Sequence, residues 1–322
     1  MKQKLSIVNY ASTLFFSVFA CTTFNANAFT CPDTNNPEVV SADCTQMVVR
    51  DNKSAITVNN GVTVSDGGIG SSYGPVSITY PSASVNVGTF TNNGTITNTY
   101  GGSFSGIQIV DGSSVTNLVN NGTISTMASS DHAGLKVTGS ITTLTNNGVI
   151  SGSTGANGIS VYANGNISTL TNSANGQINA GSGSPAILIS GGTFSYPANI
   201  GTITNLGAIQ GIQVQSGGSV GTLNNAQNGL SYSGALPGNY NIIINSLTSY
   251  GSLVAISPSG NMNFGIDTVN SNIPAGNATF ANVLQNIGPT AVTTTGITTG
   301  GYVTTRWVLS ETGNNWNLST SR

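Results

Sequence analysis

The fold of this chain is decided by the eight residues Thr89-Phe90-Thr91-Asn92-Asn93-Gly94-Thr95-Ile96, because close copies of them recur along the sequence. Residues 117–124 read NLVNNGTI and residues 143–150 read TLTNNGVI, and weaker copies begin at positions 57, 169, 202 and 222. From position 90 onwards, the central apolar residue of the phrase recurs 20 to 33 residues apart. A repeat of this length is typical of proteins built from stacked structural units.

Each repeat carries apolar residues at further equivalent positions. Ile96, Ile124 and Ile150 follow the Asn-Gly pair, and a later segment carries two alternating apolar residues, as in Ile107 and Ile109. Alternation with a period of two over about 3–5 residues indicates short strands with one buried face. We expect the Asn-Gly pairs at the corners, because Asn and Gly tolerate a positive φ. Three short strands and three turns describe one coil of a solenoid.

We therefore predict an all-β fold, a right-handed parallel β-helix (β-solenoid) with a C-terminal β-rich capping module. Coils stack about 4.8 Å apart, so equivalent residues form files along the molecule. The expected core ladder is Phe90, Leu118, Leu144, Leu170, Ile203 and Leu223. A hydrogen-bonded row of amides is expected at one corner, from Asn92, Asn120, Asn146, Asn172 and Asn205. The alternative is a β-sandwich or meander, because Asn-Gly pairs also favour hairpins.

The first 28 residues are predicted to be a signal peptide. Lys2 and Lys4 precede a short apolar stretch, and small residues before position 29 predict cleavage after Ala28. The alternatives are a buried N-terminal helix and a lipid-modified Cys21. We expect the apolar stretch to be too short and interrupted for a membrane anchor.

The rest of the chain divides into three predicted parts. Residues 29–53 form an N-terminal cap with a disulfide between Cys31 and Cys44, since a close pair of cysteines in an exported chain favours a bridge over free thiols. Residues 54–230 hold the β-solenoid repeats. Residues 231–322 form the C-terminal capping module, in which we expect several strands, one or two helical turns within 279–287, and a final hairpin that carries Trp307 and Trp316. Their large side chains would cover the open end of the core.

The composition argues against several classes of function. The chain has 7 Lys and Arg, 9 Asp and Glu and 1 His, and charged residues make up 5% where an ordinary soluble domain has about 25%. Seven cations cannot form the basic face that nucleic-acid binding requires, so no nucleic-acid partner is predicted. Acid–base catalysis draws on the same scarce residues. We predict no catalytic residue, no metal site and no cofactor.

Taken together, the leader, the Asn-Asn-Gly-Thr-Ile repeats and the segment from Tyr240 to Leu318 resemble the passenger region of bacterial type V autotransporters. Residues 240–251 are similar to the autochaperone-like module that precedes the translocator in many of these proteins, and haemagglutinin-like β-helical surface proteins share the repeat. The resemblance implies an exported protein, at the cell surface, in the outer membrane or secreted. It implies adhesion or self-association through a rigid stalk, with an unidentified surface ligand or like molecules as partners. An outer-membrane translocator barrel is a further expected partner if the gene continues past Arg322; a passenger fragment, a truncated gene and a free exoprotein all fit the sequence.

Two rival functions rest on other residues. Pairs of threonines flank the inward apolar residue and would form the hydroxyl and methyl array of an ice-binding solenoid, although Asn117 and Val119 interrupt it. The pairs are Thr89 and Thr91, Thr143 and Thr145, Thr169 and Thr171, and Thr202 and Thr204. A polysaccharide-acting β-helical enzyme would instead need clustered ionisable groups. The early coils offer Asp66, Asp111, Asp131 and Lys136 at no common position, and His132 is expected in an exposed loop.

Overall fold

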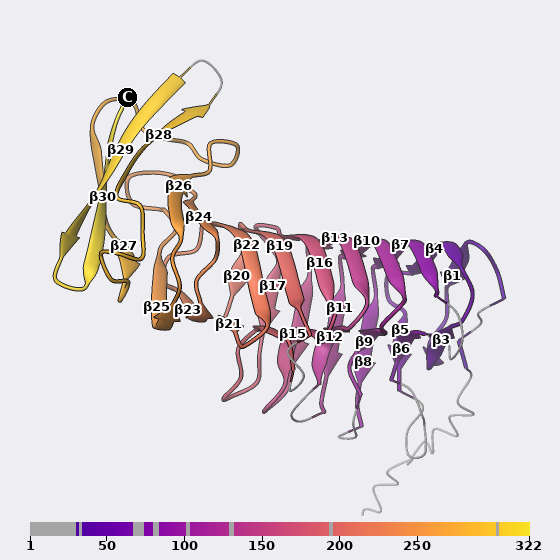
Figure 1. Ribbon diagram of the computed structural model, residues 1–322. Coiled ribbons are helices and arrows are strands. Elements are labelled where there is room, and N and C mark those ends of the chain that lie inside the picture. Colours follow the sequence, from indigo (N-terminus) through magenta and orange to yellow (C-terminus); the bar gives the residue numbers. More distant parts are fainter. Residues whose placement is uncertain are drawn as a thin grey trace, which may run out of the picture.

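In the computed structural model the chain forms a long stack of short β-strands, and the described residues contain no helix (Figure 1). The structure describes residues 30–31, 34–66, 74–79, 84–100, 104–128, 132–192, 196–300 and 303–322. The predicted signal peptide (1–28), its cleavage position after Ala28, and Asp131 lie outside these residues. The described strands form three sheets, and one coil of chain adds one strand to each sheet in turn.

A ten-stranded sheet runs along the stack, and all its neighbouring strands are parallel. In spatial order they are β1 (Glu38–Val40), β4 (Lys53–Val58), β7 (Asn86–Asn92), β10 (Ser114–Asn120), β13 (Ser140–Asn146), β16 (Asn166–Asn172), β19 (Ala198–Asn205), β22 (Gly218–Asn225), β24 (Asn239–Ile242) and β26 (Asn263–Ile266). No two strands that follow each other in the sequence pair within this sheet. The described structure is therefore the predicted parallel β-helix, and the hairpin-based alternative is wrong.

Two further sheets complete the walls of the solenoid. The seven-stranded sheet consists of β2 (Cys44–Thr45), β5 (Thr63–Ser65), β8 (Thr95–Asn98), β11 (Thr123–Thr126), β14 (Val149–Gly152), β17 (Gln177–Asn179) and β20 (Ala208–Ile209). The parallel part of the thirteen-stranded sheet consists of β3 (Met47–Val49), β6 (Val76–Ile78), β9 (Ile107–Ile109), β12 (Ala133–Val137), β15 (Asn157–Tyr162), β18 (Ile187–Ser190), β21 (Ile212–Val214), β23 (Leu230–Ala235), β25 (Leu253–Ser259) and β27 (Ala278–Gln285). From β22 onwards a coil has only two strands, because the seven-stranded sheet ends at β20.

The core is a set of aliphatic files that run along the inside of the stack. In the ten-stranded sheet Leu118 lies beside Phe90 on one side and Leu144 on the other, and the file continues through Leu170, Ile203 and Leu223. All six side chains of the predicted core ladder are fully buried. Burying one such side chain contributes about 1.5–3 kcal/mol, and each added coil repeats the contribution.

The same file continues beyond the predicted ladder at both ends. Ile56 pairs with Phe90 toward the N-terminus, and Tyr240 and then Phe264 follow Leu223 toward the C-terminus. The ring of Phe264 packs edge-on against Trp307, with 5.1 Å between ring centroids. Aromatic pairs of this geometry are favourable, and they close the core where the aliphatic residues end.

Residues that we expected in a polar N-terminal cap form the first coil of the solenoid itself. Strands β1, β2 and β3 pair in parallel with β4, β5 and β6, one in each sheet. Cys31 and Cys44 form a disulfide with 5.0 Å between their Cα atoms, and both are buried. Cys44 pairs with Val64 at the start of an inward file. The disulfide therefore closes the first coil from inside the core.

The C-terminal region also continues the stack further than the repeats do. Strand β27 covers most of the segment that we expected to be helical (279–287); that prediction is wrong, because Ala278, Phe280 and Leu284 point inward from a strand beside β25. Three antiparallel strands then cap the end, β28 (Thr295–Gly300), β29 (Val303–Thr312) and β30 (Asn315–Ser321). Strands β29 and β30 form the expected hairpin around Gly313 and Asn314, and Figure 1 shows it above the last coils.

Candidate functional site

The corner between the ten-stranded and seven-stranded sheets holds a row of buried asparagine side chains, here called the amide ladder. Its members occupy one register position in successive coils and have no exposed surface. They are Asn92, Asn120, Asn146, Asn172, Asn205 and Asn225. The first five are the predicted Asn corner. Asn225 was not among the predicted corner residues; in its repeat Ala226 and Gln227 stand where Asn93 and Gly94 stand in the quoted phrase.

Each side-chain amide of the ladder donates to the next coil. The Nδ2 atom of Asn92 lies 2.8 Å from Oδ1 of Asn120, and Nδ2 of Asn120 lies 2.8 Å from Oδ1 of Asn146. The chain continues at 2.9, 3.0 and 3.1 Å through Asn172, Asn205 and Asn225. The second amide hydrogen is also satisfied, as where Asn146 donates to the carbonyl of Gln177 at 3.1 Å. A fully satisfied buried network of this kind rigidifies the corner.

A second, exposed row lies one residue further along the chain. The Nδ2 atom of Asn147 donates to Oδ1 of Asn121 at 2.8 Å, and Nδ2 of Asn121 donates to Oδ1 of Asn93 at 2.8 Å. These amides donate toward the N-terminal end of the stack, whereas the buried ladder donates toward the C-terminal end. The two rows of dipoles therefore oppose each other.

The glycine of the Asn-Gly phrase is required by close packing between coils, and the expected positive φ is wrong for these copies. Gly94, Gly122 and Gly148 do not have a positive φ, although Gly61 in the earliest copy does, at 77°. A Cβ atom on Gly122 would lie 1.9 Å from the carbonyl oxygen of Gly94, and one on Gly148 would lie 2.1 Å from that of Gly122. Coils can stack at this corner only because no side chain separates their backbones.

The amide ladder and the seven-stranded sheet end together at Gln227. Its Oε1 accepts from the backbone N–H of Ile209 at 2.8 Å, and its Nε2 donates to the carbonyl of Ile209 at 3.0 Å. The side chain thus makes the two hydrogen bonds that another strand would make to β20. It also accepts from Asn205 at 3.0 Å. One glutamine therefore covers a sheet edge that would otherwise present unpaired backbone groups.

The outward side of the ten-stranded sheet, here called the flat face, repeats small polar side chains in straight files. One file runs Thr89, Asn117, Thr143, Thr169, Thr202 and Thr222, and the next runs Thr91, Val119, Thr145, Thr171, Thr204 and Asn224. The predicted threonine pairs lie in register, uninterrupted over β13, β16 and β19, with the break at Asn117 and Val119 where the sequence indicated it. Toward the C-terminal end the files turn to asparagine, and Asn241 donates to Asn224 at 2.9 Å.

No ionisable side chain lies on the flat face. Within the ten-stranded sheet only Glu38 and Lys53 are charged, and both are buried, on β1 and β4. The face is therefore a neutral surface of hydroxyl, methyl and amide groups. Threonine predominates over β13, β16 and β19, and asparagine predominates toward the C-terminal end.

The other ionisable residues that we considered lie apart from one another. Asp66 is buried and accepts from the backbone N–H and the hydroxyl of Thr99 at 2.9 and 2.7 Å. Asp111 accepts from the next N–H of its own turn at 3.0 Å. His132 is partly buried just before β12. Among the described residues no three His, Cys, Asp or Glu side chains come together in a way that could hold a metal ion.

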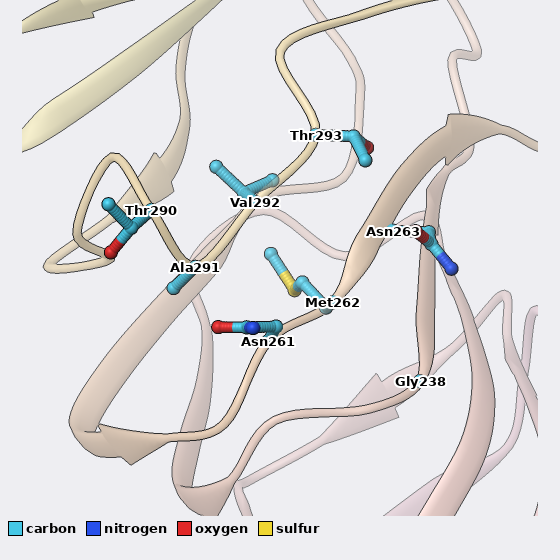
Figure 2. Close-up of a pocket in the computed structure, with 8 residues that line it drawn as sticks. All are labelled: Gly238, Asn261, Met262, Asn263, Thr290, Ala291, Val292 and Thr293. Carbon is cyan, nitrogen blue, oxygen red and sulfur yellow. The ribbon is translucent and has the colours of Figure 1, made fainter.

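A hollow of about 360 Å³ lies where the solenoid meets the C-terminal cap (Figure 2). Figure 2 shows Met262 pointing toward the segment 290–293, which is held by a bond of 2.8 Å from the N–H of Phe264 to the hydroxyl of Thr293. None of its lining residues is ionisable; they are Gly238, Asn261, Met262, Asn263, Thr290, Ala291, Val292 and Thr293. The described lining of this hollow therefore supplies no charged group to a ligand.

Comparison of the chain with protein families, with curated proteins and with solved structures finds no match in any of the three. The described residues include no helix of the length and apolarity needed to cross a membrane. Among the described residues the flat face is a surface on which small polar side chains recur in register over six successive strands, from β7 to β22.

Proposed function

We propose that this chain is an exported bacterial surface protein of the autotransporter-passenger type, which associates with further copies of itself through the flat face and carries out no catalysis. The observation that carries the proposal is the flat face itself, because small uncharged side chains, most of them threonine or asparagine, line it in register from β7 to β22. The buried Cys31–Cys44 disulfide supports export, since such bonds persist in oxidising compartments.

The size of the flat face is adequate for association. The six central strands from β7 to β22 are 7 or 8 residues long. At about 4.8 Å between strands and about 3.3 Å per residue they present a surface of roughly 650 Å². The shorter strands at both ends extend it toward the roughly 800 Å² that each partner buries in a stable interface.

The chemistry of the flat face suits pairing between identical copies. Each threonine hydroxyl or asparagine amide makes a weak contact, but many equivalent contacts along a rigid surface act together. The chain carries a formal net charge of −2, yet none of that charge lies on this face. Two copies therefore approach through the flat face without direct repulsion between side chains.

A charge placed on the flat face tests the proposal. The triple variant Thr143→Lys, Thr169→Lys and Thr202→Lys puts three ammonium groups in one outward-facing, half-buried file, so paired faces would repel each other. We expect the unmodified protein to sediment as dimers or larger species and the variant to sediment as a monomer. A matched control places three lysines on the thirteen-stranded sheet, at Gln108, Gln213 and Ser233.

The two variants carry the same net charge, so only the location of the lysines differs. Equal sedimentation of both variants, or a monomeric unmodified protein at all concentrations, would contradict self-association through the flat face. Cells that display the chain should aggregate, and the same triple variant should abolish that aggregation. Sequencing the gene beyond the codon for Arg322 tests the autotransporter assignment separately, by the presence or absence of a translocator.

A second candidate function is ice binding, which is favoured by the unbroken threonine pairs of β13, β16 and β19. Regularly spaced hydroxyl and methyl groups on a rigid sheet match the requirement for ordered surface water. Thermal hysteresis of the purified chain, lost in the triple lysine variant, would support this function. Absence of hysteresis at millimolar concentration would exclude it.

A further inference from the structure

The outward side of the thirteen-stranded sheet contains a second, smaller hollow of about 200 Å³. Three consecutive coils supply its walls: Lys136 on β12, Ser160 and Tyr162 on β15, and Leu188 on β18. The register of the sheet places Ser160 directly between Lys136 and Leu188. All four of these lining residues lie on strands of the solenoid wall.

The hollow holds the only cation in a long stretch of the chain. No other Lys or Arg occurs between Lys53 and Arg306. The residues that pair with Lys136 in the adjacent coils are Gln108 and Ser160, which are uncharged. The side chain of Lys136 therefore marks the hollow as the place on the parallel part of this sheet that carries a positive group.

The aromatic side chain beside the cation lies against Gly192, which leaves room for it. The Nζ atom of Lys136 lies 6.0 Å from the ring centroid of Tyr162, at the outer limit of a cation–π contact. A Cβ atom on Gly192 would lie 3.0 Å from Cζ and Oη of Tyr162, so any larger residue there would displace the ring. The Tyr162 ring and the Lys136 ammonium group thus line the same hollow. Ser160 and Leu188 line it as well, on the strands β15 and β18.

These four groups match one class of ligand. An ammonium group binds a carboxylate through charge-assisted hydrogen bonds, an aromatic ring and a leucine accept the C–H face of a pyranose, and a serine bonds a sugar hydroxyl. A volume of about 200 Å³ is smaller than the 300–1,000 Å³ of drug-sized pockets and suits a single sugar ring. A single cation does not provide the several phosphate contacts on which nucleic-acid binding depends.

We propose that this hollow is a binding site for an acidic saccharide, in which the carboxylate of a uronic acid contacts Lys136 and the sugar ring packs on Tyr162 and Leu188. The site goes beyond the proposed self-association, because it lies on a different sheet from the flat face. A solenoid that carries it would attach to acidic polysaccharide on one side while the flat face pairs with another copy.

The test compares two probes that differ only at C6, methyl β-D-glucuronide with a carboxylate and methyl β-D-glucoside with a neutral hydroxymethyl group, in titrations of the full chain followed by NMR. We expect the glucuronide to bind at least about tenfold more tightly than the glucoside, and to lose that advantage as salt screens the ammonium group. Lys136→Gln should remove the preference for the glucuronide. Tyr162→Ala should weaken binding of both probes, whereas Tyr162→Phe should retain it.

Arg306→Gln is the matched control, because it removes one cation from the C-terminal cap and leaves the hollow intact. Leu188→Glu provides a second variant that places a negative charge inside the hollow and should repel the glucuronide alone. Equal affinity for the two probes, no detectable glucuronide binding, or glucuronide binding that survives both Lys136→Gln and Leu188→Glu would overturn the proposal. Because the triple lysine variant of the flat face leaves this hollow unchanged, it should bind the glucuronide as the unmodified protein does, whatever its state of association.

Discussion

Replacing Asn146 with alanine tests whether the amide ladder stabilises the fold. Asn146 has no exposed surface, its Nδ2 donates to Asn172 and to the carbonyl of Gln177, and its Oδ1 accepts from Asn120. Alanine removes all three hydrogen bonds, each with a net contribution of about 1 kcal/mol. It also leaves Oδ1 of Asn172 buried without the amide that donates to it, at a cost of about 1–3 kcal/mol.

The expected loss in the free energy of unfolding is therefore about 4–6 kcal/mol. The chain provides a matched control in the next residue, because Asn147→Ala removes a bond of the same length, 2.8 Å to Asn121, from an exposed row. Exposed substitutions of this kind change stability by about 0.5 kcal/mol or less. Urea unfolding followed by circular dichroism measures both variants under the same conditions. Equal losses for the two, or a loss below about 1 kcal/mol for Asn146→Ala, would refute the reasoning that burial makes the ladder important.

Three further predictions concern single positions. Gly122→Ala should destabilise the fold by about 3 kcal/mol or more, because the added Cβ would lie 1.9 Å from a backbone carbonyl oxygen. Gly288→Ala is the control, since the space around Gly288 is open; it should change the thermal midpoint little, whereas Gly122→Ala should lower it. Gln227→Ala should leave the backbone groups of Ile209 at the end of the seven-stranded sheet without their partner. We expect the free energy of unfolding to fall by about 1–3 kcal/mol and light scattering to increase on storage, because an uncovered sheet edge promotes aggregation. Unchanged scattering would argue against an edge-covering role. Burial raises the pKa of the Tyr240 phenol above its ordinary value of about 10, so the phenol stays neutral in the folded state. In the unfolded chain the phenol ionises near pH 10. The free energy of unfolding is therefore unaffected by this group below pH about 10 and decreases as the pH rises further. Absorbance at 295 nm should therefore show a delayed titration step that moves to lower pH in urea, and a spectrum in which every tyrosine titrates together in the folded protein would contradict it.

The repeated residues allowed the middle of the fold to be predicted from the sequence. Leu118 and Asn120 could be assigned to inward files because their equivalents recur in five or more coils with the same neighbours, and stacking requires that identity. The threonine pairs could be placed on an outward face for the same reason. A strand with a period of two leaves little choice of face once one residue is known to be inward.

The two ends could not be predicted in the same way. Strands β1 to β3 are only 2 or 3 residues long and lack the repeated phrase, so nothing in their sequence shows that they stack on β4 to β6. The apolar residues Phe280, Val283 and Leu284 of β27 and Ile287 just after it have helical spacing, and pairing of β27 with β25 and β30 overrides that local preference. The Lys136 and Tyr162 hollow depends on two residues from different coils, and their proximity follows from the register, which only the structure shows.

The parallel register of the central coils has a consequence for how such a chain changes length. Removing residues 118–143 would join Asn117 to Leu144, and Phe90 would then lie beside Leu144 with the same file, the same buried amide and the same corner glycine as before. The inward contacts at the new junction would match the old ones, because each coil contacts only its two neighbours. Gain or loss of a whole coil is thus a nearly neutral change for the fold, and a lineage of such proteins can set the reach of its solenoid in steps of about 4.8 Å.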